Sequence, residues 1–347
     1  MSSENFTKGQ GAQRNEINRF EKYTFEPEED DFQKTKTVFT EVFPKTIVNE
    51  VKSPDLRMEY SLNPYQGCEH GCSYCFARPT HEFWGYSAGT DFERKIMIKK
   101  NAPELLEKFF QKRNYVPKTI TLSGNTDCYQ PVEREFEITR KILKLCLDYR
   151  HPVSILTKNA LVLRDMDILK PLSEQNLVSV SFSIPTINEE IRRKMEPRTS
   201  SVKNKLKAIE ILTEHQIPVG VMVAPVIPGL TSDESLNILK TISEAGAQKF
   251  GYVLVRLNDT VEPVFINWIN ANFPDRAEKV LNFIRSIRGG KLGDKRFHER
   301  YKGEGNLAEM IHDTFALGRR KFFADKEITP LSTENFTGSK DQQLKLF

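Results

Sequence analysis

The sequence has no hydrophobic run long enough to cross a bilayer and no apolar segment behind its first residues. Its 347 residues are 38% hydrophobic and 28% charged, and every apolar stretch falls short of the about 20 residues that a membrane helix needs. The opening segment, MSSENFTKGQGAQRNEINRF, is polar and lacks the apolar core of a secretory signal. These absences predict a cytoplasmic chain with no membrane contact.

Glycine, proline, cysteine and net charge are also scarce. Gly and Pro number 18 each, which excludes a fibrous or low-complexity chain, and the hydrophobic fraction excludes wholesale disorder. The formal charge is only +4, so overall charge does not indicate a polyanionic partner. The 5 cysteines are an odd number in a compartment that keeps thiols reduced, which argues against a disulfide framework.

From about residue 56 the sequence alternates short β-rich runs with longer amphipathic helical patterns, which is typical of parallel βα units. The expected strands are Arg57–Leu62, Lys118–Ser123, Pro152–Thr157, Leu177–Ile184, Pro218–Ala224 and Phe250–Val255. Six such units in roughly 200 residues predict an α/β fold, a partial (β/α)6 barrel of the TIM type, because a complete barrel needs about 250. An open doubly wound sheet is the alternative topology.

Four regions differ in composition. Residues 1–55 form a polar leader, which we expect to be partly disordered or draped over the core. Residues 56–290 carry the barrel pattern, residues 291–332 form a helical and basic C-terminal extension, and residues 333–347 form a flexible tail.

One expected strand is apolar on one face and serine-rich on the other. Between Val178 and Ile184 every second residue is serine, and side chains alternate between the two faces of a strand. Thr119, Thr121 and Ser123 alternate with apolar residues in the same way. Because parallel strands buried on both faces are apolar throughout, these patterns indicate a barrel interior that holds a polar ligand. The alternative is an amphipathic strand at a solvent-exposed edge.

Three of the cysteines, Cys68, Cys72 and Cys75, fall within eight residues in the pattern C-x3-C-x2-C. Thiolate is the ligand that iron–sulfur clusters take, so this loop predicts a cluster with three protein ligands and one open iron. The loop follows the first expected strand, at the end of the sheet where barrel active sites lie. The alternative is a zinc site completed by His70 or His81.

This spacing, with the aromatic Tyr74 before the last cysteine, resembles the radical S-adenosylmethionine superfamily. The resemblance covers about residues 57–290. It implies a 4Fe-4S cluster on the three cysteines and S-adenosylmethionine bound to the open iron. It also implies an external one-electron reductant and a 5′-deoxyadenosyl radical that abstracts hydrogen from a substrate.

The resemblance assigns cofactor contacts to the carboxyl ends of the strands. Ser123, Gly124, Asn125 and Asp127 stand where the superfamily places the turn that binds the methionine amino group, although its usual acidic residue is displaced here. Lys158 would pair with the methionine carboxylate; alternatively it is a solvated loop lysine.

Further contacts follow from the same resemblance. Ser181 and Ser183 would bind the ribose, Val226 would line the adenine, and Tyr74 would lie beside it. Arg198, in Glu196-Pro197-Arg198, is either a second clamp for a carboxylate or the substrate, or half of a charge pair at a helix end.

Within the superfamily, four segments resemble relatives of spore photoproduct lyase. They are Asn63–Cys68, Thr126–Pro131, Met195–Arg198 and Ala224–Gly229. That lyase repairs a thymine dimer in DNA and carries a hydrogen-donating cysteine on the second strand. Here Thr121-Leu122-Ser123 has none, so its activity does not transfer. Cys128, slightly later, is a candidate hydrogen donor or a small buried residue, and Cys146 is expected in the core.

Two C-terminal features indicate partners. The segment 285–302 has a local charge of +5 and nearby aromatics, which suits phosphate binding and base stacking or is solvated surface. The apolar end of the tail is similar to the peptide by which bacterial repair enzymes bind the replication sliding clamp, with packing on the domain as the alternative. Its residues are Gln343, Leu344, Leu346 and Phe347.

We therefore expect a radical enzyme acting on a nucleic acid, in a manner resembling DNA repair. The competing hypotheses are a radical enzyme acting on a protein or small molecule, and a cluster-bearing sensor that binds nucleic acid without turnover.

Overall fold

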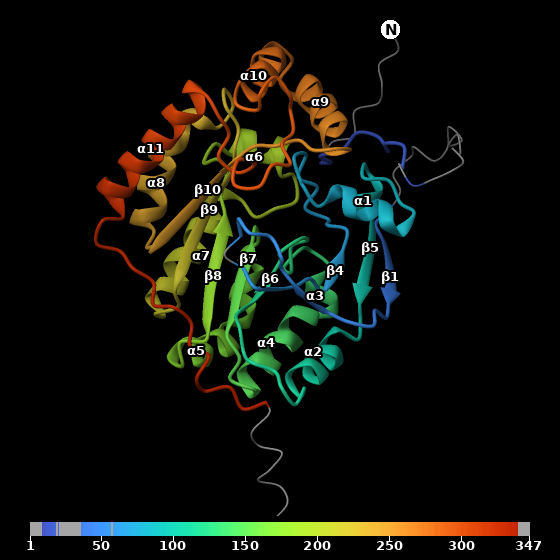
Figure 1. Cartoon of the computed structure of the whole chain (residues 1–347), viewed down its shortest axis with the longest axis vertical. Helices are drawn as coiled ribbons and strands as arrows, with labels where there is room; N and C mark the ends of the chain where they lie inside the picture. The colour runs from blue at the N-terminus through green and yellow to red at the C-terminus, as the bar shows by residue number, and fades with distance from the viewer. Residues whose placement is uncertain (1–8, 19, 21–35, 57, 339–347) are drawn as a thin grey trace, which may run out of the picture.

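The computed structural model describes residues 9–18, 20, 36–56 and 58–338, and within them a seven-stranded sheet forms the centre (Figure 1). Its order is β10-β9-β8-β7-β6-β3-β2, in which all neighbours are parallel except β2 and β3. The strands are β2 (Val48–Glu50), β3 (Tyr60–Leu62), β6 (Ile120–Leu122), β7 (Val153–Thr157), β8 (Val178–Ser183), β9 (Val219–Val226) and β10 (Lys249–Leu254). The six parallel strands confirm the predicted partial barrel.

Each predicted strand is present and differs from its expected range only at the ends. Arg57 lies outside the described residues, and β3 begins at Tyr60. β9 extends to Val226, two residues beyond the expected end. Strand ends depend on where the neighbouring strand stops offering hydrogen bonds, which alternation within one segment does not reveal.

Helices pack on the outer face of this sheet because that face is apolar. Val178, Val180 and Phe182 of β8 are fully buried in one large core cluster with residues of the helices. The main helices are α2 (Ala102–Phe110), α4 (Ile138–Asp148), α5 (Met166–Glu174), α7 (Val202–Glu214), α8 (Ser235–Glu244) and α11 (Asn306–Phe322). On the opposite face Thr121, Ser154 and Ser181 are only half-buried. The polar, more accessible face therefore lines the concave side.

A smaller sheet, of order β1-β5-β4, lies beside the barrel and carries the site loops. Its strands are β1 (Val38–Val42), β4 (Tyr65–Gln66) and β5 (Lys95–Lys99), and two short helices, η2 (Arg78–Trp84) and α1 (Asp91–Arg94), connect β4 to β5. Residues 38–50 therefore supply strands to both sheets, β1 to this one and β2 to the edge of the other.

Segments distant in sequence close the open side of the sheet. Arg300 pairs with Asp55 at 2.5 Å, and the His298 amide donates to the same carboxylate at 3.1 Å. These contacts join the loop before β3 to the loop before α11.

The remaining helices, α3 (Glu133–Phe136), α6 (Glu189–Met195), α9 (Val261–Asn272) and α10 (Pro274–Ser286), complete the fold. α6, α9 and α10 share a second core cluster centred on Trp268, above the carboxyl ends of the strands. At the opposite end of the molecule, residues 327–338 run past α5 and α4 (Figure 1), and Phe336 contacts Phe110 of α2. No helix among the described residues is long and apolar enough to span a membrane.

Candidate active site

The three clustered cysteines lie on the loop after β4, which its own turns hold in shape. Cys68 and Cys72 are buried and Cys75 is half-buried. The Gly71 amide donates to the Cys68 carbonyl at 3.4 Å, and the Cys75 amide donates to the Cys72 carbonyl at 3.3 Å. Gly71 has a φ of 65°, a left-handed conformation that suits glycine, so the chain folds back between the first two cysteines.

These thiols suit a multi-iron group better than a single ion. All five cysteines are free, and burial raises the pKa of Cys72 and of Cys75. In the part of the chain that the structure describes, no three His, Cys, Asp or Glu side chains converge closely enough to hold one metal ion. A 4Fe-4S cube takes each thiolate at a different iron, so its ligands need not converge on one point. The donor set therefore fits such a cluster, with one iron left open.

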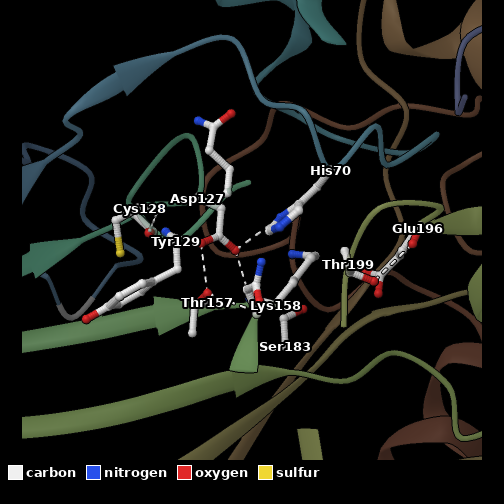
Figure 2. Close-up of polar contacts among 12 residues, drawn as sticks. His70, Asp127, Cys128, Tyr129, Thr157, Lys158, Ser183, Glu196 and Thr199 are labelled. Carbon is white, nitrogen blue, oxygen red and sulfur yellow. Dashed lines mark hydrogen bonds and ion pairs between the residues drawn. The ribbon is translucent and has the colours of Figure 1, made fainter. Parts of the chain in front are cut away.

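Asp127 connects the cysteine loop to the ends of β6 and β7 (Figure 2). Its Oδ1 accepts a hydrogen bond from the Thr157 hydroxyl and one from the Tyr129 amide, both 2.8 Å long. Its Oδ2 accepts one from the Lys158 amide at 2.7 Å and lies 3.3 Å from Nδ1 of buried His70. Burial opposes charge on both members of this pair, but their attraction lowers the pKa of Asp127 and raises that of His70.

A second buried carboxylate, Glu196, faces the same space from the segment after α6. It accepts hydrogen bonds from the Tyr74 hydroxyl and from Lys205, the latter at 3.1 Å. Lys205 also donates to the Ser183 carbonyl at 3.2 Å, which ties this carboxylate to the end of β8. Burial raises the pKa of Glu196, but Lys205 and Lys158 outweigh that effect, and the pKa is lowered.

The Lys158 side chain lies between these two acidic groups at the end of β7. Burial opposes its charge, but Cys72, Glu196 and Asp127 together raise the pKa of Lys158. No hydrogen bond of its ammonium group is found among the described residues. The site therefore holds a charged, half-buried donor next to the cysteine loop.

Comparison with known proteins agrees with this geometry. The model of the radical SAM superfamily matches residues 62–242, which span the cysteine loop and strands β6 to β9. The chain belongs to the radical SAM superfamily. An uncharacterized protein of Mycobacterium bovis is 32% identical over 250 residues, which cover 71% of this chain and 74% of that protein. One of Methanocaldococcus jannaschii is 30% identical over 238 residues, covering 69% and 85%.

Solved structures show the branch of the superfamily to which the fold is similar. Spore photoproduct lyase in complex with dinucleoside spore photoproduct aligns with a TM-score of 0.61 over 82% of this chain and 79% of that chain, at 16% identity. A Pseudomonas phage M6 protein named radical SAM Nalpha-GlyT isomerase is 24% identical over 252 residues, which cover 70% of this chain and 49% of that protein. This radical SAM protein is therefore an enzyme related in fold to the lyase.

The turn after β6, which contains Ser123, Gly124 and Asn125, is held by hydrogen bonds and by close packing against β3. Ser123 has a φ of 73° and accepts a hydrogen bond from the Cys128 amide at 2.7 Å. A Cβ at Gly124 would lie 2.8 Å from the Ser61 Cβ, so a side chain there would have to displace β3. The Asn125 amide donates to the Asn63 side chain at 2.8 Å. The backbone of this turn is thus fixed against the edge of the barrel.

Other predicted cofactor residues lie at the ends of β8 and β9. The Ser183 hydroxyl donates to the Ala224 carbonyl at 3.2 Å, and Ser181 is half-buried on the concave face. Val226, the last residue of β9, is fully buried in the main core. Tyr74 packs with the second core cluster and directs its hydroxyl to Glu196.

Arg198 and Cys128 occupy different surroundings from the groups around Lys158. Arg198 lies 3.4 Å from the Glu93 carboxylate. Cys128 is fully buried in the main core cluster, where burial raises the pKa of its thiol well above the usual range. Cys146 is also fully buried there.

Most basic side chains in 285–302 are paired with acidic groups of the same molecule, so less of the segment's charge is available than its composition suggests. Arg288 is buried and donates to the Leu254 carbonyl at 2.7 Å. Arg296 pairs with Asp294 at 2.8 Å, and Arg300 is engaged by Asp55. Lys291 and Lys302 are exposed and make no ion pair with any described residue.

Several residues of the site carry no local sequence signal. The pairing of His70 with Asp127 and that of Lys205 with Glu196 join positions far apart in sequence or on different elements. His81, the other candidate zinc ligand, is fully buried between the Tyr86 and Phe92 rings, and no described side chain donates to or accepts from its ring nitrogens. The signal that marks these residues is that they are polar and buried, and this burial can be seen only once the fold is known.

Proposed function

We propose that this protein cleaves S-adenosylmethionine reductively at a 4Fe-4S cluster held by Cys68, Cys72 and Cys75. When bound, these groups supply a 5′-deoxyadenosyl radical for hydrogen abstraction, with one electron from an external reductant. The observation that carries the proposal is the loop of three free thiols, Cys68, Cys72 and Cys75, which Asp127 joins to Lys158 at the end of β7. Both cofactors are those that the superfamily implies.

The chain's own residues would orient the cofactor around that loop. Lys158 would bind the methionine carboxylate, because its ammonium group would neutralise that carboxylate at close range. The turn Ser123–Asn125 and Asp127 would border the methionine amino group, and Arg198, whose amide donates to the His70 carbonyl, would be a second clamp. Ser181 and Ser183 would bind the ribose, and Tyr74 and Val226 would line the adenine.

Asp127 has little capacity left for a direct contact. Its two oxygens already receive three hydrogen bonds and the ion pair with His70, which fills the roughly four lone-pair positions of a carboxylate. In this proposal Asp127 orients the turn, and backbone carbonyls of the turn accept from the amino group. Cys128 is buried in the main core. Its thiol could give a hydrogen atom to a substrate radical only if the substrate reached the core side of β6.

The first experiment tests cluster formation and cofactor cleavage. After anaerobic reconstitution, the native chain should bind about four irons and form 5′-deoxyadenosine with a strong reductant. Cys72→Ser should lose most of the iron and all of the cleavage, because one ligand of the cube is lost. Cys146→Ala, which removes a buried thiol outside the loop, is the matched control and should retain both. Native protein that contains zinc, or no iron and sulfide, would refute the proposal.

For the substrate, we propose a nucleic acid, with a damaged or modified base as the target. The fold is similar to a lyase solved with a dinucleoside photoproduct, and a relative is named as an Nalpha-GlyT isomerase. Arg256 and Arg300 stack on Tyr301 at 4.8 Å beside exposed Phe297, which gives the open side of the barrel an aromatic border suited to base stacking.

Salt-dependent binding of a fluorescent oligonucleotide tests this substrate class. Lys291→Gln with Lys302→Gln should weaken binding and reduce the salt slope by about 0.9 for each phosphate that is no longer neutralised. Lys207→Gln with Lys240→Gln, which removes two exposed charges from α7 and α8, is the matched control and should leave both values unchanged. If the native protein cleaves its cofactor but shows no salt-dependent binding, the substrate is a protein or small molecule. Binding without any cofactor cleavage would favour the sensor.

The tail proposed to bind a sliding clamp, with Gln343, Leu344, Leu346 and Phe347, lies outside the described residues. The last described residues, up to Gly338, run along the end of the molecule opposite α9 and α10. Deletion of Phe347 should abolish capture by immobilised clamp, and unchanged capture would refute this partner.

A further inference from the structure

Residues 9–18 lie directly on the cysteine loop, although more than fifty positions separate the two in sequence. A Cβ built on Gly11 would fall 1.7 Å from the Gly71 carbonyl oxygen and 2.9 Å from the Ser73 nitrogen. Only a glycine can approach so closely. The two backbones are therefore in contact between Cys68 and Cys75.

A buried carboxylate, Glu93, lies between the N-terminal segment and the cysteine loop and contacts both. Its Oε1 accepts a hydrogen bond from the Ala12 amide at 2.7 Å, and its Oε2 one from the Gly11 amide at 3.3 Å. Oε2 would also lie 2.7 Å from a Cβ on Gly71, so the cysteine loop passes directly over this carboxylate. Glu93 is fully buried, and a buried carboxylate is stable only when donors surround it.

The principal donor to Glu93 is Arg78, and Arg78 holds the cysteine loop itself. Arg78 is fully buried and contacts Glu93 Oε1 at 2.5 Å. Its Nε and Nη2 both donate to the Cys72 carbonyl, at 3.0 and 2.8 Å. One planar guanidinium therefore fixes the backbone of a cluster ligand, and Glu93 fixes the guanidinium.

The N-terminal segment is anchored on both sides of this contact. Asn15 Oδ1 accepts hydrogen bonds from the Thr90 hydroxyl at 2.8 Å and from the Asp91 amide at 2.9 Å. Asn18 is buried and donates to the Glu82 and Tyr86 carbonyls. A Cβ on Gly89 would lie 2.2 Å from the Arg14 carbonyl oxygen, a second crossing that needs glycine. The segment thus follows a specific path across the loop.

We propose that residues 9–18 form a protective cover of the iron–sulfur site and that Glu93 is the positioning residue that fastens it to the Cys72 turn. This inference rests on the proposed cluster but not on any substrate. Iron–sulfur clusters are sensitive to solvent exposure, and a backbone packed against Gly71 excludes water and oxygen from one side of the loop. The three cysteines bind the iron, and the cover sets how long the cluster survives.

The experiment compares cluster loss in air with cluster loading under argon. Gly11→Ala introduces the Cβ that the Gly71 carbonyl cannot accommodate, so the cover should detach while the ligands stay intact. We expect native iron content after anaerobic reconstitution, and decay of the visible cluster absorbance in air at least about fivefold faster, as for loss of roughly 1 kcal/mol of local stability. Ile17→Ala, at a side chain 72% exposed in the same segment, is the matched control and should decay at the native rate.

A second variant examines the fastening residue. Glu93→Gln keeps the size of the side chain but removes the charge that Arg78, Arg198 and two amides share, and it should accelerate decay in air as Gly11→Ala does. The double variant should lose its cluster in air little faster than either single variant, because both substitutions detach the same segment. Circular dichroism establishes that each variant is folded.

The outcomes separate this inference from the cofactor chemistry. Native decay rates in Gly11→Ala, or equally fast decay in Ile17→Ala, would overturn the cover, as would loss of iron from Gly11→Ala already under argon. Because the readout is cluster absorbance without cofactor or substrate, absence of 5′-deoxyadenosine in the native protein would contradict the proposed reaction and leave the cover standing.

Discussion

Asp127 is the side chain on which the geometry of the site depends most. It joins a histidine of the cysteine loop, the hydroxyl and the following amide at the end of β7, and the Tyr129 amide of its own turn, so three stretches of chain meet at one carboxylate. A neutral amide of the same size would present an NH2 group to at least one of those donors. The contribution of Asp127 to the stability of the protein can therefore be measured without any cofactor.

We predict that Asp127→Asn lowers the free energy of unfolding by about 2–4 kcal/mol, because it leaves buried His70 without its ionic partner. Urea unfolding of the cofactor-free protein measures this. The matched control is Asp167→Asn on α5, which removes a carboxylate 60% exposed to solvent and should change stability by less than about 1 kcal/mol. Equal effects of the two substitutions would show that the Asp127 network adds nothing beyond a surface pair.

Replacing Lys158 is expected to change the affinity for S-adenosylmethionine but not the iron content of the protein. Lys158→Met keeps the length of the side chain and removes its charge, so S-adenosylmethionine should bind the reconstituted protein about tenfold more weakly or worse, as for loss of a charge-assisted hydrogen bond. The matched control is Lys240→Met, at an exposed lysine of α8, which should bind S-adenosylmethionine with native affinity. Isothermal titration and iron analysis measure the two properties, and unchanged affinity with native iron would remove Lys158 from the site.

At the scale of residues, the sequence locates the cysteine loop but not the side chains that support it. The cysteine spacing is local, so a short stretch of sequence suffices to identify the loop. The pairing of His70 with Asp127 depends on how the cysteine loop returns to β6, and Glu93 becomes significant only where three separate segments meet. Such contacts are set by the fold and leave no pattern in neighbouring residues.

Among the elements, the segment after α11 shows how loops complete the barrel. Phe336 is 8% exposed and packs edge-on against Phe110, Tyr115 and His151, and the Thr337 amide donates to the Tyr149 carbonyl at 3.1 Å. This segment therefore covers an aromatic cluster between α2 and α4.

We predict that Phe336→Ala destabilises the protein by about 2–4 kcal/mol, because it leaves a cavity among those rings. Thermal or urea unfolding measures the loss. Phe297→Ala, at a ring 54% exposed, is the matched control and should cost about 1 kcal/mol or less. A result near zero for Phe336→Ala would mean that the segment does not stay packed in solution.

Element prediction succeeded where one segment carries its own pattern. Helix α4 repeats its apolar residues along one face, and β8 alternates Val178, Val180 and Phe182 with serines. The small sheet was not predicted, because β1 pairs with β5 more than fifty residues later and its first residues are exposed. Strand pairing over such distances follows from the tertiary fold.

For the whole molecule, buried histidines predict how stability changes with pH. Burial lowers the pKa of His151 to about 3, against an ordinary value of 6.5. Between these values the unfolded chain binds a proton that the native protein does not, so stability falls as pH falls. From pH 7 to pH 5 this one group should remove about 2 kcal/mol.

His151→Phe should flatten that dependence, even though it also removes the hydrogen bond with the Tyr115 hydroxyl. Urea unfolding at several pH values measures the slope. His215→Phe, which replaces an exposed histidine at the end of α7, is the matched control for loss of one imidazole. A slope in His151→Phe as steep as in the native protein would contradict the assignment.

The two described ends of the chain lie at opposite poles of the molecule, with Gly9–Asn18 near α9 and Phe336 near α2 (Figure 1). An affinity tag or fluorescent fusion joined ahead of Gly9 would disturb the packing of residues 9–18 on the cysteine loop. The cluster of the purified protein would then be lost faster in air. The same tag joined behind Phe336 would sit on the far pole. Purification handles therefore belong on the carboxyl side, and yields of brown protein from the two orientations would reveal the difference.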